Sequence, residues 1–230
     1  MTRTFKVLAA LLSYPNEDIQ AAAPAFRAVL AEDGLLPERQ QVRIGQLIDQ
    51  LTERDLYDLQ ERFVSLFDRS KSLSLHLFEH VHGESRDRGQ AMVDLQALYA
   101  EHGLEISAKE LPDYIPLFLE FLSVLPLDEA RALLGEPAHV LEALRDRLRK
   151  RKSIYASVFR ALLTLTSGKP AASAGDVATE DDDPDDLEAL DKAWAEEPVT
   201  FGPGDEACPV AGDMVARMNQ EPGTAPGAKA

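Results

Sequence analysis

Apolar residues recur at three- and four-residue spacing from about residue 4 to residue 167, a pattern typical of amphipathic helices. The clearest example is 55–67, whose apolar positions are Leu56, Leu59, Phe63, Leu66 and Phe67. No stretch shows the apolar–polar alternation of a half-buried strand. Leu and Ala dominate a hydrophobic fraction of 45%, which suits helix-on-helix packing. The pattern therefore predicts an all-α fold, a single helical bundle.

Turn and capping residues divide this bundle into predicted helices. Asn16 is a helix cap, Pro24 is a candidate kink, and Gly103 and Gly135 are stop signals. The predicted helices are 4–12, 16–30, 38–51, 55–67, 74–81, 85–99, 117–122 with 110–116 as its opening, 127–134, 137–151 and 153–167. The segment 117–122 is apolar on most sides, so we expect its helix to be central.

The composition changes sharply after residue 168. Residues 171–230 hold 15 acids and 3 bases, a net charge of −12, whereas residues 1–170 carry only −4. Such a segment buries too little apolar surface to offset its ordering entropy. We therefore predict a helical domain over 1–168 and a mostly disordered acidic tail over 169–230. A short amphipathic segment near 186–195, with Leu187, Leu190 and Trp194, either folds back onto the domain or binds a partner.

Several classes of protein are excluded by composition. The nearly balanced charge of 1–170 argues against nucleic acid as a partner. The basic run at 145–152 could touch phosphate, but cations at the C-terminal end of a helix are the favoured interpretation. One cysteine, Cys208, excludes a disulfide framework, and no apolar run is long enough for direct membrane insertion. We expect a cytoplasmic protein.

The segment 76–82 is the strongest candidate for chemistry. On a helix His76 and His80 would share a face, and with Glu79 they match the His-x-x-Glu-His order of inverted zinc proteases. A zinc-dependent hydrolase would need a third ligand, which nothing in the chain singles out. A hydrogen-bonded polar patch is the favoured interpretation. We predict no catalytic residue, no metal and no cofactor.

A second charged cluster follows at once, with Arg86, Asp87 and Arg88 near a helix start. It should form one polar neighbourhood with 76–82, which Asp113 and Glu120 would join if the central helix packs there. Buried charges are costly unless they are paired, so this neighbourhood is a candidate binding site.

Four segments, 12–15, 63–69, 73–89 and 110–121, resemble in this order the delta-type (NarJ) assembly chaperones of respiratory nitrate reductase. These are a branch of the TorD/DmsD group of redox-enzyme maturation chaperones. The resemblance covers roughly 4–168 and the acidic stretch 186–190. It implies an all-helical chaperone and not an enzyme. The implied partner is the apo catalytic (alpha) subunit, bound through its N-terminal segment and kept competent for molybdenum cofactor insertion and membrane assembly.

The resemblance also implies site residues. Phe63, Leu66 and Phe67 match the group's aromatic-x-x-Leu-aromatic motif, whereas Tyr114 stands where the wider group has His after Pro-x-Asp. A role that needs an imidazole at 114, including the nucleotide binding suggested for relatives, is therefore not expected. The predicted peptide-binding residues are Phe63, Leu66, Phe67, His76, Glu79, His80, Arg86, Asp87, Arg88, Asp113, Tyr114 and Glu120.

Two other functions remain open at this point. One is a zinc-dependent hydrolase that uses His76, Glu79 and His80. The other is a signalling adaptor whose acidic tail folds on a partner. The hypothesis we favour is that a basic amphipathic peptide meets the aromatic residues with its apolar face and the carboxylates with its cations.

Overall fold

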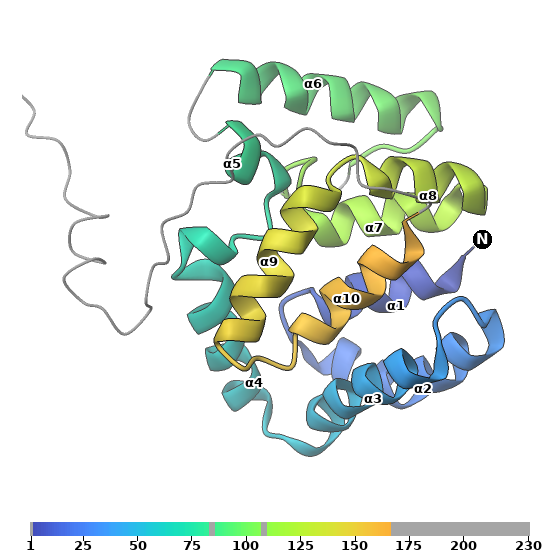
Figure 1. The fold of residues 1–230 in the computed structure, drawn as a ribbon, viewed down its shortest axis with the longest axis vertical. Coiled ribbons are helices and arrows are strands. Elements are labelled where there is room, and N and C mark those ends of the chain that lie inside the picture. Colours follow the sequence, from blue (N-terminus) through green and yellow to red (C-terminus); the bar gives the residue numbers. More distant parts are fainter. Residues whose placement is uncertain (1, 83–85, 107–109, 167–230) are drawn as a thin grey trace, which may run out of the picture. The chain divides into compact units, whose positions relative to one another are not determined.

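The computed structural model describes residues 2–82, 86–106 and 110–166, and ten α-helices lie within them (Figure 1). They are α1 (Arg3–Leu11), α2 (Glu17–Asp33), α3 (Glu38–Glu53), α4 (Leu56–Phe63), α5 (Leu77–His82), α6 (Arg86–Glu101), α7 (Ile115–Val124), α8 (Leu127–Gly135), α9 (Ala138–Lys150) and α10 (Ala156–Leu165). The described residues form no strand, only one isolated bridge pair. The predicted all-α fold is confirmed, whereas the predicted tail and its amphipathic segment lie outside the described residues.

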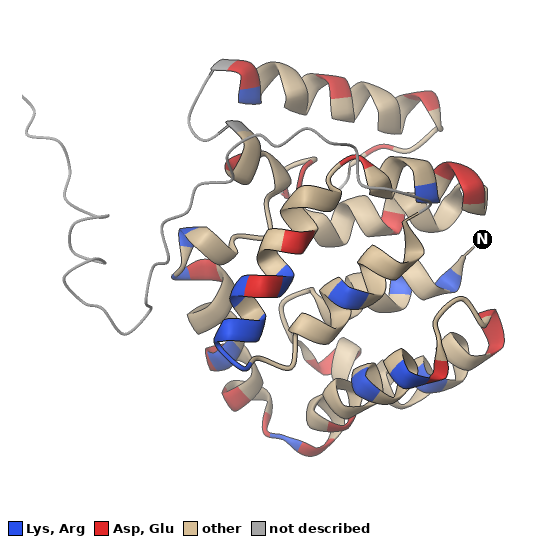
Figure 2. Cartoon of the chain, viewed as in Figure 1, with Lys and Arg blue, Asp and Glu red and all other residues tan. Residues whose placement is uncertain are grey.

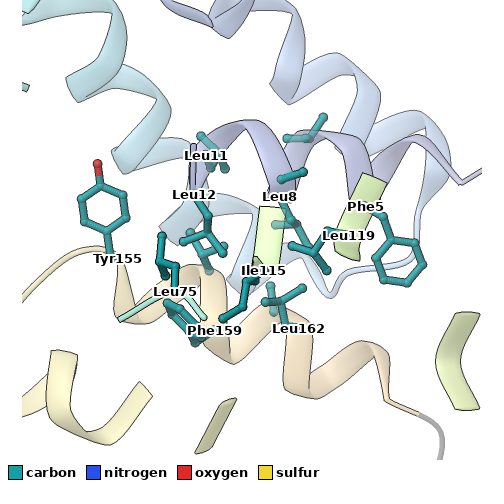
Figure 3. Packing of buried hydrophobic residues seen from close by; sticks show 14 of the residues in the cluster. Phe5, Leu8, Leu11, Leu12, Leu75, Ile115, Leu119, Tyr155, Phe159 and Leu162 are labelled. Carbon is teal, nitrogen blue, oxygen red and sulfur yellow. The ribbon is translucent and has the colours of Figure 1, made fainter. Parts of the chain in front are cut away.

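The core is built around α1, which packs against α7, α2 and α10. The side chains of Phe5, Leu8, Leu11 and Leu12 on and just after α1 are at most 1% exposed. Figure 3 shows them meeting Ile115 and Leu119 of α7 and Phe159 and Leu162 of α10. The expectation that the apolar helix after residue 114 is central is confirmed, because most of α7 is buried.

The start of α2 follows the predicted signal, and its end is set by a glycine. The Asn16 side chain accepts a hydrogen bond from the backbone N–H of Ile19 at 2.8 Å, and Gly34 ends the helix with a φ of 63°. That left-handed conformation favours glycine. Pro24 lies inside α2 and does not interrupt it. No helix within the described residues combines the length and the apolar character needed to cross a bilayer.

The predicted helix over 55–67 is divided in the structure. Asp55 caps α4 by accepting from the N–H of Tyr57 at 2.8 Å, and α4 ends at Phe63. A π-helical turn, η1 (Val64–Asp68), follows, with the N–H of Arg69 donating to the carbonyl of Val64 at 3.0 Å. Apolar periodicity does not distinguish a π-turn from an α-helix, so the prediction of one continuous helix was wrong at this end.

Residues 75–77 and 113–115 run side by side after a 3-10 turn, η2 (Lys71–Leu73). The N–H of Leu77 donates to the carbonyl of Asp113 at 3.1 Å, and the N–H of Ile115 donates to the carbonyl of Leu75 at 2.8 Å. His76 and Tyr114 form the isolated bridge pair. The backbone of 113–114 is therefore used in this pairing. The helix α7 begins at Ile115, within the segment 110–116 that was predicted to open it, with Pro116 in its first turn.

Candidate functional site

Asp113 is the organising residue of the polar neighbourhood. Its side chain is fully buried, and its carboxylate accepts from the N–H of Phe78 at 3.0 Å through Oδ2. Its Oδ1 lies 3.2 Å from Nδ1 of His76. A buried carboxylate is tolerated because these donors satisfy it. Asp113 thus fixes the start of α5 to the segment before α7, and an external cation cannot reach it in this conformation.

His76 and Tyr114 lie on the paired segments that Asp113 holds together. Their rings are 5.4 Å apart between centroids and tilted by 36°. Burial raises the pKa of the Tyr114 hydroxyl, and the charges of Glu110 and Asp68 raise it further. Two exposed carboxylates that the predictions missed, Asp68 and Glu110, therefore lie near this ring.

His80 makes a different contact. Its Nε2 lies 2.8 Å from the carbonyl oxygen of Ser74, so this nitrogen carries the proton and donates it. The side chain is buried, and burial lowers its pKa, against the opposing effect of the hydrogen bond to Ser74. For His76 the hydrogen bond to Asp113 raises the pKa, and partial burial opposes that. The pKa values of the two histidines are thus shifted in opposite directions.

We expect opposite pH effects on stability from these histidines. Below about pH 6.5, the usual pKa of histidine, His76 is charged in both states and its bond to Asp113 stabilises the fold. His76→Gln should therefore cost most there, and less as pH rises through the raised folded-state pKa. His80 must stay neutral to fold, so the native chain should lose stability relative to His80→Gln as pH falls below about 6.5. Each unit of pKa difference corresponds to about 1.4 kcal/mol.

The measurement is urea unfolding of the native chain and both variants from about pH 5 to about pH 9, a range that brackets the histidine pKa. The difference curves of the two variants against the native chain should slope in opposite directions. Flat difference curves for both variants would contradict the hydrogen-bond assignments.

The charged cluster after residue 85 does join this neighbourhood. Arg88 of α6 donates from Nη2 to Oε1 of Glu79 on α5 at 3.2 Å. Asp87 is exposed at the start of α6. Arg86 begins α6, but its side chain lies outside the described part of the structure. The Glu79–Arg88 pair means that Glu79 already has a cationic partner in this chain.

The geometry does not support a zinc site built from His76, Glu79 and His80. His76 precedes α5, which begins at Leu77, so the two imidazoles do not share a helical face as predicted. Nδ1 of His76 is directed to Asp113 and Nε2 of His80 to a backbone carbonyl. Within the described ranges no three His, Cys, Asp or Glu side chains converge as metal ligands would. The backbone pairing of 76 with 114 takes His76 out of the helix that the spacing suggested.

Phe63, Leu66 and Phe67 lie in and against the core. Phe63 and Phe67 are 3% and 4% exposed, with ring centroids 4.9 Å apart, and the Phe67 ring meets Tyr155 edge-on at 5.1 Å. Leu66 is partly buried against the same core. In this conformation the three side chains of the motif pack in or against the core of the domain. Their role in peptide binding stays a prediction.

Glu120 lies elsewhere, on the rim of a groove of about 260 Å³ beside α7. The groove is lined by Tyr99 of α6, by Leu104, Glu105 and Ile106 after it, by Leu117, Glu120, Phe121 and Val124 of α7, and by Lys6 of α1. Glu105, Glu120 and Lys6 are exposed, and the other lining residues are apolar or aromatic. We call this the apolar groove.

Tyr99 fixes the wall of the apolar groove. Its ring packs on Phe121 with centroids 4.6 Å apart, and its hydroxyl donates to the carbonyl of Pro112 at 2.8 Å. Burial raises the pKa of this hydroxyl, which stays protonated and keeps donating. Among the predicted site residues only Glu120 pointed to this groove. It is an exposed carboxylate in an otherwise apolar helix, which is the one signal in the sequence that could have located it.

Known proteins resemble the chain over most of its length. The family model described as nitrate reductase delta subunit matches residues 16–161. The chain is 44% identical over 211 residues to the nitrate reductase molybdenum cofactor assembly chaperone NarJ of Escherichia coli (strain K12), covering 87% of each. It is 39% identical over 197 residues to a protein of that strain named "Probable nitrate reductase molybdenum cofactor assembly chaperone NarW", covering 85% of this chain and 82% of that protein.

One solved structure shares the fold. It is a crystal structure described as that of a redox enzyme maturation protein from Archaeoglobus fulgidus, with a TM-score of 0.52 and 24% sequence identity. The match covers 71% of this chain and 91% of that one. At this identity the likeness concerns the fold alone.

Proposed function

The chain belongs to the nitrate reductase delta subunit family, and we propose from this that it is an assembly chaperone of nitrate reductase. In this proposal it acts in the cytoplasm and binds the apo catalytic (alpha) subunit through that subunit's N-terminal segment. It keeps the subunit competent for molybdenum cofactor insertion and is not itself an enzyme. The names of the two Escherichia coli relatives, both assembly chaperones, support the role.

The observation that carries the peptide-binding part is the chemistry of the apolar groove. A floor of Leu117, Phe121 and Ile106 can take apolar side chains, and the carboxylates of Glu105 and Glu120 stand exposed at its rim. A basic amphipathic segment would match both features. Its apolar face would fill the groove, and its cations would meet the rim.

Among the predicted carboxylates, Asp87 and Glu120 are exposed, and of these only Glu120 lines the apolar groove. Asp113 is fully buried and has its own donors, and Glu79 has Arg88 as partner. The exposed carboxylates Asp68 and Glu110 near Tyr114 extend the acidic surface toward the start of α7. In this proposal the Asp113 network holds α5 and α7 in position and does not itself touch the peptide.

We expect the double reversal Glu105→Lys with Glu120→Lys to weaken binding of the catalytic subunit's N-terminal peptide at least about tenfold. Two rim charges that attract cations would then repel them, and close charge pairs of this kind contribute about 1.5 kcal/mol or more. The measurement is calorimetric titration of the folded variant with the synthetic peptide.

The matched control is Asp58→Lys with Glu61→Lys, two exposed acids on α4 that change the net charge by the same amount. Its affinity should stay close to that of the native chain. Equal weakening in both double variants would mean that only the total charge matters, and it would move the peptide away from the apolar groove.

A further inference from the structure

A second groove, of about 420 Å³, lies between α3 and the connection from α9 to α10. We call it the basic groove, because its lining includes Arg43, Arg149, Lys152 and Arg160 and no acidic residue. Figure 2 shows the basic residues gathered on α3, at the C-terminal end of α9 and on α10. Two residues of the basic run at 145–152, Arg149 and Lys152, therefore line a groove.

The cations of the basic groove are poorly neutralised. Arg43, Lys152 and Arg160 are exposed and form no ion pair with any residue that the structure describes. Within the described ranges Arg149 pairs with Asp146 alone, at 3.8 Å, and its side chain is 67% exposed. Four like charges around one hollow repel each other and attract a multivalent anion.

The groove also offers apolar surface. Ile154 and Ala156 line it beside the cations. A free phosphate or a nucleic acid backbone would use only the charges. A polyacidic peptide that carries leucines would use both the charges and the apolar surface.

Such a segment occurs in this chain. Residues 180–190 contain seven acids and no base, together with Leu187 and Leu190. The chain as a whole has a net charge of −16, which disfavours nucleic acid as the occupant of a single basic groove. The segment and the groove are therefore complementary in charge and in apolar character.

The chain is long enough for the contact. The groove includes Ala156 and Ser157 at the start of α10, and the ten residues of α10 span about 15 Å. Thirteen residues lie between Thr166 and residue 180 and are mostly Ala, Gly, Ser and Thr. A flexible linker of that length has a root-mean-square span of roughly 20 Å. When the span of a linker matches the distance that it must bridge, the effective concentration of the tethered segment at its site is in the millimolar range.

We propose that residues 180–190 occupy the basic groove of their own chain. This goes beyond the chaperone function and does not depend on it. The segment covers Arg43, Lys152 and Arg160, so these cations are unavailable to other polyanions while it is bound. Because the contact is mostly ionic, it weakens as salt shortens the Debye length from about 10 Å at 0.1 M to about 3 Å at 1 M.

The test is zero-length carbodiimide cross-linking of the full chain, which joins the Lys152 amine to a carboxylate in contact with it. Mass spectrometry should find Lys152 joined to residues within 180–190 at low salt, with the yield falling several-fold at high salt. Arg43→Glu with Arg160→Glu should abolish most of this product. Adding Asp182→Lys and Asp183→Lys to that variant should restore it.

The control is Arg54→Glu with Arg69→Glu, two exposed arginines outside the basic groove, which should leave the yield unchanged. Three outcomes would overturn the proposal. One is equal cross-linking of 180–190 to the exposed Lys6 and Lys71. Another is an unchanged yield after reversal of Arg43 and Arg160. The third is a product that joins ¹⁵N-labelled to unlabelled chains in a mixture, which would place the segment on a second copy.

Discussion

Replacing Phe63 with alanine is expected to lower the free energy of unfolding by about 3–5 kcal/mol. The ring is 3% exposed and contacts three aromatic neighbours, with centroids 4.9 Å away for Phe67, 5.7 Å for Tyr14 and 6.5 Å for Tyr155. Alanine would remove these contacts and leave a cavity between α4, the segment after α1 and the start of α10. Urea unfolding measures the loss, which is a large part of the about 5–15 kcal/mol of a typical domain.

The control on the same helix is Tyr57→Ala, because Tyr57 is 78% exposed. Its effect should stay within about 0.5 kcal/mol. Phe63→Leu separates packing from recognition, since leucine keeps most of the buried volume and the variant should fold. If the Phe63 ring only packs the core, peptide affinity stays unchanged in Phe63→Leu. A large loss of affinity in that folded variant would show that the peptide reaches the ring, and it would contradict a purely structural role.

Replacing Asp113 with alanine is expected to cost about 3 kcal/mol of stability. The carboxylate is the acceptor for the buried N–H of Phe78 and the partner of the His76 ring, so both groups would lose it at once. A donor left unsatisfied in the interior costs about 1–3 kcal/mol, and bonds to a charged group are at the strong end. Urea unfolding near neutral pH is the measurement.

Two comparisons sharpen the Asp113 result. Asp113→Asn keeps one carbonyl oxygen as an acceptor, so it should cost less than the alanine variant. Asp58→Ala removes an exposed carboxylate of α4 and should change stability by no more than about 0.5 kcal/mol. If Asp113→Ala cost no more than Asp58→Ala, the carboxylate would not be holding α5 to the segment before α7.

The helices could be predicted from the sequence because each buries an apolar stripe and ends at a recognisable residue. Asn16 and Gly34 are examples: one caps α2 and the other ends it. The π-turn after Phe63 and the pairing of 75–77 with 113–115 could not be predicted. Both depend on backbone hydrogen bonds, which leave no periodic pattern in the sequence, and the second joins Leu75 to Ile115, 40 positions apart.

The polar neighbourhood was predicted in part, since Asp113 joins it and Glu120 does not. The charge patterns correctly suggested that Asp113 would join His76 and that the cluster after residue 85 would join 76–82, as the Glu79–Arg88 pair shows. The apolar groove was missed, because its lining comes from α1, α6 and α7 and no local motif marks it. His76 and His80 illustrate the same limit: their spacing fits a helix, but pairing with Tyr114 places His76 before it.

The most direct test of the proposed function is calorimetric titration of the native chain with a synthetic peptide of the nitrate reductase catalytic subunit's N-terminal segment. A scrambled peptide of the same composition serves as the reference. The account predicts saturable one-to-one binding with a Kd of about 1 µM or tighter for the native sequence, and much weaker binding for the scrambled one. Absence of saturable binding, or equal affinity for both peptides, would contradict recognition of that segment.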